Sequence, residues 1–140
     1  MPDSYEIYSI GIISKEEDHS KIILRDRYRK AVLGLDGFSH IQVLYWLHKN
    51  DDPDQRRTLQ VYPRGKRSNP LSGVFATRTP VRPNPIAVSI CKVLSIEEST
   101  EETTILVDRI DAFDGSPVID IKCHIPRDID PSEIRLPGWV

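Results

Sequence analysis

Short apolar segments separated by turn-forming residues constrain this 140-residue chain most strongly. The segments are rich in β-branched and aromatic residues, which favours strands, and no stretch of roughly 10–15 helical residues separates them. The predicted strands are Tyr5–Ile13, Lys21–Leu24, Ile41–Leu47, Thr58–Tyr62, Gly73–Thr77, Ile86–Ile96, Thr103–Ile110 and Val118–Ile125. The pattern predicts a mostly β fold, a small and largely antiparallel β-barrel or sandwich, rather than a doubly wound α/β sheet.

Helix signals are few. Arg25–Leu33 predicts one or two helical turns, and Pro131-Ser132-Glu133 predicts the start of a short C-terminal helix. The length is near the common domain size of about 100–150 residues, and no repeat or linker interrupts the chain. We therefore expect one domain over residues 1–140.

Several classes of protein are excluded by what the sequence lacks. It has no apolar run near the ~20 residues of a membrane span and no signal peptide, so we expect a cytoplasmic protein without a membrane partner. Dinucleotide, P-loop and nucleophile-elbow motifs are missing. Cys91 and Cys123 form no Cys-x-x-Cys motif, and the histidines lack metal-ligand spacing, so no metal is expected.

Positive charge is concentrated in the middle of the chain. Gln55–Ile96 contains eight Lys and Arg residues and no Asp or Glu, although the whole chain has a net charge of −2. Such a segment either binds an anion such as nucleic-acid phosphate or is a set of scattered, solvated side chains. Within it Arg64, Lys66 and Arg67, flanked by proline and glycine, predict an exposed turn that contacts a phosphate backbone.

Two segments have unusual composition. Gly73–Ser89 holds three prolines within six residues, with Arg78, Arg82 and Asn84 on the stiff loop, which suits an anion clamp or, alternatively, a crossover that blocks a sheet edge. Asp108–Lys122 contains several aspartates around an Asp-Gly turn. That turn predicts either a hairpin with solvated acids or a polar ledge for amine or ribose hydroxyl groups.

Three ordered motifs resemble the TrmO family of S-adenosylmethionine-dependent tRNA (adenine-N6)-methyltransferases. GVFATRTPVRPNPIAVS is similar to the family pattern GVFATRxPxRPNPIGLS, DGSPVIDIKCH to DGTPVxDIKPY, and GFSHIQVLYWLH to GFSHIxxLYWxH. The resemblance implies a dimeric β-barrel that binds S-adenosylmethionine without a Rossmann fold. It also implies a substrate tRNA whose adenosine beside the anticodon carries a threonylcarbamoyl group.

The resemblance assigns residues to the two ligands. The implied cofactor residues are His48, Lys49, Arg78, Val88, Asp114, Gly115, Ser116 and Pro117. The candidate substrate residues are Arg82, Asn84, Asp120 and Lys122, together with Arg64, Lys66 and Arg67. No residue can be singled out as the general base.

The chain also departs from the family pattern. Cys123-His124 replaces a Pro-Tyr pair, and the sequence ends where bacterial members continue into a further domain. These departures favour an alternative in which a methyltransferase of the same fold acts on a small molecule. A third possibility is a non-catalytic module that binds S-adenosylmethionine or RNA.

Overall fold

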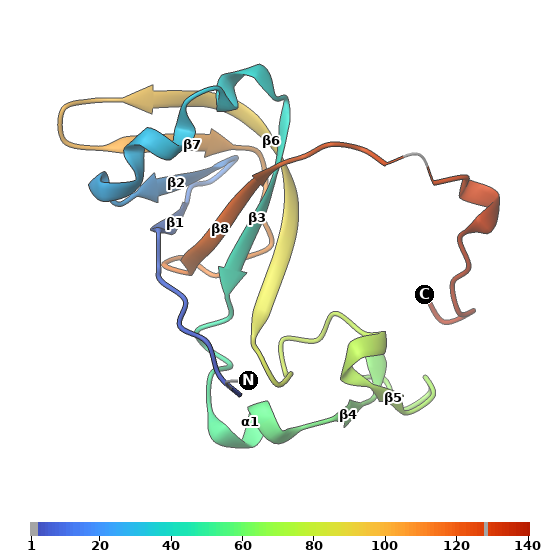
Figure 1. Ribbon diagram of the computed structural model, residues 1–140. Helices are drawn as coiled ribbons and strands as arrows, with labels where there is room; N and C mark the ends of the chain where they lie inside the picture. Colours follow the sequence, from blue (N-terminus) through green and yellow to red (C-terminus); the bar gives the residue numbers. More distant parts are fainter. Residues whose placement is uncertain (1–2, 128) are drawn as a thin grey trace.

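A computed structural model describes residues 3–127 and 129–140. Six strands form a closed barrel in the order β1-β2-β7-β6-β3-β8, in which every neighbouring pair is antiparallel (Figure 1). They are β1 (Gly11–Lys15), β2 (Ser20–Leu24), β3 (His40–Trp46), β6 (Ile86–Glu98), β7 (Thr103–Val107) and β8 (Pro117–Cys123). The prediction of a mostly β, largely antiparallel barrel is confirmed.

The interior of the barrel is filled by alternate side chains from its strands. Fully buried residues include Ile13, Ile22, Ile41, Ile105 and Val118. The strand β3 shows the alternation clearly, because its inward side chains are buried and its outward ones are half-buried or exposed. We predicted from its continuous apolar sequence that β3 is covered on both faces; its outer face is only partly covered.

The longest strand, β6, pairs with two different strands along its length. Its first part, from Ile86 to Lys92, pairs with β3, and its second part, from Val93 to Glu98, pairs with β7. The register shifts between Val93 and Ser95, where the strand changes partner. This irregularity lets one strand bend around the barrel.

Residues 47–85, here called the arm, leave the barrel between β3 and β6 and extend below it in Figure 1. The arm contains α1 (Pro53–Arg57), the two-stranded sheet of β4 (Gln60–Val61) and β5 (Ser72–Gly73), and two 3-10 turns, Pro63–Gly65 and Val74–Ala76. The predicted strands over Thr58–Tyr62 and Gly73–Thr77 are thus wrong for most of their length. The helix α1 was not predicted, although Asp52 caps it by accepting a hydrogen bond of 2.9 Å from the Gln55 N–H.

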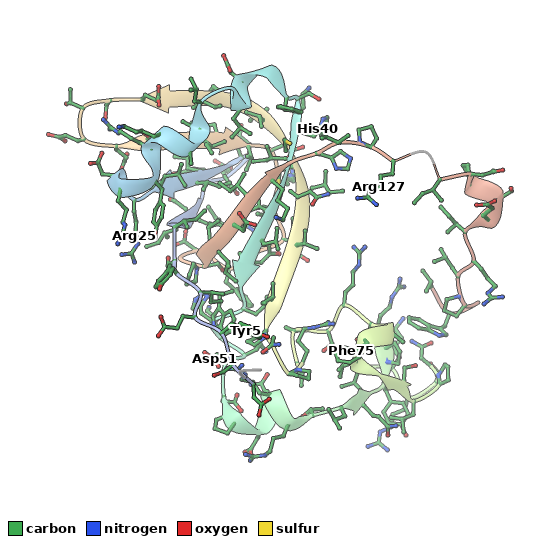
Figure 2. The ribbon with its side chains drawn as sticks, in the orientation of Figure 1. Tyr5, Arg25, His40, Asp51, Phe75 and Arg127 are labelled. Atoms are coloured by element: carbon green, nitrogen blue, oxygen red, sulfur yellow. The ribbon has the colours of Figure 1, made fainter. Side chains whose placement is uncertain are left out.

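The ends of the chain lie outside the barrel. The strand predicted over Tyr5–Ile13 begins only at Gly11, and Tyr5, Ile7 and Tyr8 are exposed. The predicted helical turns form as 3-10 helices at Asp26–Val32 and Pro131–Glu133, and a further one covers Leu35–Gly37. Beyond β8 the tail, residues 124–127 and 129–140, runs away from the barrel, with Arg127 on its first part (Figure 2). None of the helices in the described residues has the length and apolar character needed to cross a membrane.

Candidate functional site

One end of the barrel brings together the three motifs that the sequence analysis singled out. Strand β3 ends where β8 and β6 begin, because Tyr45 pairs with Val118 and Trp46 pairs with Ile86. The turn after β3, the loop before β8 and the proline-rich loop before β6 therefore leave the barrel side by side. Segments that are more than twenty residues apart in sequence become neighbours through this register.

The turn after β3 touches the loop before β8. The Lys49 ammonium lies 4.2 Å from the centre of the Phe113 ring, a cation–π contact. His48 is exposed on the same turn, and its N–H donates to the Trp46 carbonyl at 2.9 Å. His48 and Lys49 thus lie beside the segment Asp114–Pro117. Both segments were predicted to bind S-adenosylmethionine, which requires them to be neighbours.

The Asp-Gly turn is fastened to β1. An Asp114 carboxylate oxygen accepts a hydrogen bond of 2.8 Å from the Lys15 N–H, and the Gly115 N–H donates to the Ile13 carbonyl at 2.8 Å. Gly115 has a φ of +81°, a conformation that favours glycine. Ser116 is buried and its hydroxyl donates to the Phe113 carbonyl at 2.6 Å, while Pro117 begins β8. The hairpin alternative is wrong, because β7 and β8 are not neighbours in the barrel.

A buried tyrosine holds the same loop from inside the barrel. The Tyr45 hydroxyl donates to the Asp111 carbonyl and lies 3.2 Å from the Ser89 hydroxyl. Burial raises the pKa of Tyr45, so the phenol stays protonated and remains a donor. Sequence reasoning missed this residue, because an apolar run gives no sign of which side chain will reach a loop 66 residues later.

The two arginines of the proline-rich loop behave differently. Arg82 is half-buried, and its guanidinium donates to the carbonyls of Thr77 and Thr79 at 3.3 and 3.1 Å. Arg78 is exposed and makes no side-chain hydrogen bond or ion pair within the described residues. The loop therefore uses one arginine to hold its own shape and leaves the other available to an anion.

A third group of predicted residues lies on the outer face of β6, β3 and β8. Val88 sits opposite Leu44, which in turn sits opposite Asp120. The Asp120 carboxylate is 3.0 Å from the Lys122 ammonium, and its other oxygen accepts a hydrogen bond from the Ile121 N–H at 2.9 Å. Val88, Asp120 and Lys122 are thus brought onto one surface.

The basic turn of the arm has the predicted exposure. Arg64, Lys66 and Arg67 are all exposed, and Arg64 has a φ of +58° in the Pro63–Gly65 turn. The Arg67 guanidinium lies 5.4 Å from the centre of the Tyr62 ring. No polar or cation–π contact connects this turn to the end of the barrel described above within residues 3–127 and 129–140, so it forms a separate basic surface.

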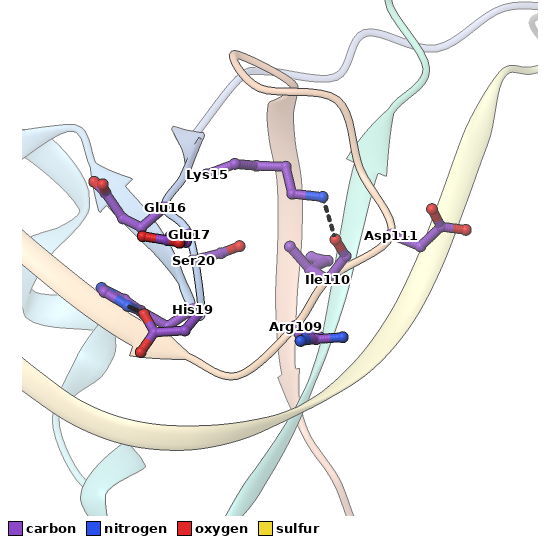
Figure 3. A pocket seen from close by; sticks show the side chains of 9 residues that line it. Lys15, Glu16, Glu17, His19, Ser20, Arg109, Ile110 and Asp111 are labelled. Carbon is purple, nitrogen blue, oxygen red and sulfur yellow. Dashed lines mark hydrogen bonds and ion pairs between the residues drawn. The ribbon is translucent and has the colours of Figure 1, made fainter.

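The hollow shown in Figure 3 lies elsewhere. It has a volume of about 540 Å³ and opens between the β1–β2 turn and residues 109–111, with the Lys15 ammonium donating to the Ile110 carbonyl at 3.0 Å. None of the residues predicted for the cofactor or substrate lines it. Its walls carry both acidic and basic side chains, and it does not define the candidate site.

The cysteines differ in environment. Cys91 is fully buried, and burial raises the pKa of its thiol to about 11, so it is not an available nucleophile. Cys123 is partly buried, and both thiols are free. Among the described residues, no group of three or more His, Cys, Asp and Glu side chains is placed to hold a metal ion.

This barrel is similar to solved structures of tRNA-modifying proteins and matches the model of one protein family. Crystal structures of TrmO from Pseudomonas aeruginosa share the fold; one superposes with a TM-score of 0.71 at 24% identity, covering 99% of this chain and 63% of that one. Residues 11–130 match the model of the tRNA-methyltransferase O N-terminal domain. The chain belongs to the TrmO family.

Two curated relatives illustrate the range of that family. A Methanocaldococcus jannaschii protein named "probable S-adenosyl-L-methionine-binding protein" is 41% identical over 84% of this chain and 90% of its own length. The tRNA (adenine(37)-N6)-methyltransferase of Escherichia coli is 31% identical over 83% of this chain. This chain spans about half of that enzyme, 48% of its length.

Proposed function

We propose that this protein methylates the exocyclic N6 nitrogen of a threonylcarbamoyl-modified adenosine beside the tRNA anticodon, in the cytoplasm. The protein is an S-adenosylmethionine-dependent methyltransferase of the tRNA adenine-N6 family. The threonylcarbamoyl group, the cytoplasmic location and the individual site residues are the proposed part. Bound S-adenosylmethionine supplies the electrophilic methyl group.

The observation that supports this function is the meeting of the three motif segments at one barrel end. Lys49 contacts Phe113 there, and the proline-rich loop enters β6 next to Trp46. A methyl transfer needs the nitrogen, the methyl carbon and the sulfur in line, so the protein contributes mainly by holding two ligands in one geometry. A site built from three braced loops suits that task.

The side chains at this end fit the chemistry of the cofactor. Arg78 and Lys49 are exposed cations able to bind its carboxylate. Val88, 56% exposed, offers an apolar surface to an adenine ring. Only one oxygen of Asp114 is hydrogen-bonded within the described residues, so the other remains an acceptor for an amine or a ribose hydroxyl.

The substrate assignment rests on charge. The acid-free segment Gln55–Ile96 includes the basic turn of the arm, which suits a phosphate backbone. The threonylcarbamoyl group carries a carboxylate, and Arg82 has further N–H groups beyond those that bind its own loop. Asp120 offers an acceptor for the protons of the attacking amine, and the Asn84 side-chain amide offers N–H donors to an acceptor on the substrate.

We also propose a homodimer. The outer side of β6 exposes Ile86, Val88, Ile90 and Leu94, and the tail exposes Ile125, Ile134 and Leu136. Apolar surfaces of this extent usually mark an interface, and a second copy would cover them. Sedimentation at micromolar concentration should show a dimer that Ile90→Glu shifts toward monomer; a wild-type monomer with cofactor bound would refute it.

The decisive experiment is turnover. Release of S-adenosylhomocysteine is measured with threonylcarbamoylated tRNA, with tRNA lacking that group, and without RNA. Turnover confined to the modified tRNA is the expected result. Equal turnover on both RNAs would remove the threonylcarbamoyl assignment. No turnover on either RNA would favour a small-molecule methyltransferase or a binding module.

A further inference from the structure

Arg56 in α1 donates hydrogen bonds to three different residues where the two ends of the arm meet the barrel. Its Nε donates to the Pro83 carbonyl at 2.8 Å, one Nη to the Asp51 carboxylate at 3.1 Å and the other Nη to the Asn84 side-chain oxygen at 3.2 Å. The guanidinium also lies 5.5 Å from the centre of the Trp46 ring. One side chain therefore connects the helix, the end of β3 and the proline-rich loop.

The partners of Arg56 are themselves fixed. The other oxygen of Asp51 accepts a hydrogen bond from the Trp46 indole N–H at 3.1 Å. Trp46 belongs to the barrel, at the end of β3 next to Ile86, and Asp51 lies on the turn beyond it (Figure 2). Arg56 thus links the rigid end of β3 to the proline-rich loop, which is also tied to the barrel by the Leu47 N–H donating to the Pro85 carbonyl at 2.7 Å.

We propose that Arg56 is the positioning residue for Asn84. Because the Asn84 oxygen accepts from Arg56, its amide group is turned so that the two N–H donors face away from the arginine. A freely rotating asparagine would present either end to a ligand, whereas this one presents donors. The inference rests on the proposed function, in which Asn84 contacts the substrate.

If Arg56 served only to stabilise the fold, its replacement would mainly lower the free energy of unfolding rather than change tRNA binding. The Arg56 side chain is 37% exposed and is not among the buried core residues, so its loss should change the unfolding equilibrium little. Its neighbour Arg57 is a matched control, because it lies on the same helix and, within the part of the chain that the structure describes, pairs only with Asp54, three residues earlier, at 2.5 Å. Lysine at either position keeps the charge but loses the planar fork that reaches three acceptors.

The first test is a double-mutant cycle measured by turnover on tRNA. We expect Arg56→Lys to raise the KM for tRNA about tenfold while leaving the affinity for S-adenosylmethionine within about twofold, and Arg57→Lys to change neither. Asn84→Ala should have an effect of similar size. In the Asn84→Ala background, Arg56→Lys should have no further effect, because the residue through which it acts is gone. Additive effects would overturn the proposal.

The second test does not depend on the substrate. The Ile86 N–H donates to the Asn84 carbonyl at 2.7 Å, so its hydrogen exchange reports whether the loop is held. Exchange should accelerate in Arg56→Lys and stay at the wild-type rate in Arg57→Lys. Unchanged exchange in Arg56→Lys would overturn the positioning role. Faster exchange in a protein inactive on every tRNA would retain that role and refute only the proposed substrate.

Discussion

In the barrel, side chains such as Ile22 and Ile105 are completely inaccessible to solvent, whereas in the arm only Pro63, Val74 and Pro85 are buried. The barrel is held by apolar burial around a closed ring of strands. The arm is held by prolines, a capped helical turn and hydrogen bonds such as those of Arg56. Most of the proposed ligand contacts lie in the arm or at its root, so stability and ligand binding should be separable by mutation.

The largest difference should come from removing core volume. Ile22→Ala leaves a cavity in the closed barrel and should reduce the free energy of unfolding by about 2–5 kcal/mol. In the arm, Leu59→Ala, at a side chain that is 64% exposed, should change it by less than about 0.5 kcal/mol. Urea denaturation checks both, and similar losses would show that the arm is part of the core.

The next effect is a loss of stability at alkaline pH. Burial raises the pKa of Cys91 from 9.0 to about 11, so the folded state keeps a proton that the unfolded state releases earlier. The stabilisation is complete below pH 9 and should decline by about 2–3 kcal/mol as the pH rises to 11. Unfolding measured across this range in wild type and Cys91→Ser isolates the effect. Parallel pH profiles would contradict it.

A smaller effect should appear in the free energy of cofactor binding when a residue of the arm is replaced, with the stability of the barrel unchanged. Arg78→Ala should weaken S-adenosylmethionine binding by about 1.5–3 kcal/mol, the contribution of a charged hydrogen bond, with no loss of folding stability. Arg78→Lys should restore it only in part, because an ammonium lacks the fork. Calorimetry measures both affinities; an unchanged affinity in folded Arg78→Ala would remove Arg78 from the cofactor site.

The mildest perturbation of the folded protein should be the triple replacement of Arg64, Lys66 and Arg67 by alanine. These exposed side chains should leave stability and cofactor affinity unaltered. The salt dependence of tRNA binding should flatten by about two to three units on a log–log plot, because fewer counterions are released. Binding titrations over a range of salt concentrations test this, and an unaltered slope would show that the turn does not contact phosphate.

The sequence predicted the barrel far better than the arm, for a physical reason. Strands such as β3 and β7 are recognisable because their apolar side chains must enter a shared interior. Tyr5–Ser9 has the same β-forming residues, yet no strand among the described residues pairs with it, and pairing is not encoded locally. In the arm, Asp52-Pro53 begins α1, but the same pair of residues is also typical of a turn, so the sequence alone does not distinguish the two.

The candidate site shows the same limit. His48, Lys49 and Asp114 could be assigned through motifs and do lie on adjoining loops. Arg56 could not be assigned in this way. Its hydrogen bonds form only when Pro83 and Asn84, 27 and 28 residues later, fold back onto α1. Contacts of this kind depend on where the barrel places the two ends of the arm.

The position of β3 in the barrel has a consequence for the order of folding. Both of its neighbours, β6 and β8, come later in the chain, and β6 is separated from it by the whole arm. During synthesis, β1 and β2 can pair at once, but β3 emerges with two open edges and must wait for the arm to be made. The arm, which holds many of the proposed ligand contacts, is thus also the segment whose synthesis leaves β3 unpaired and open to aggregation.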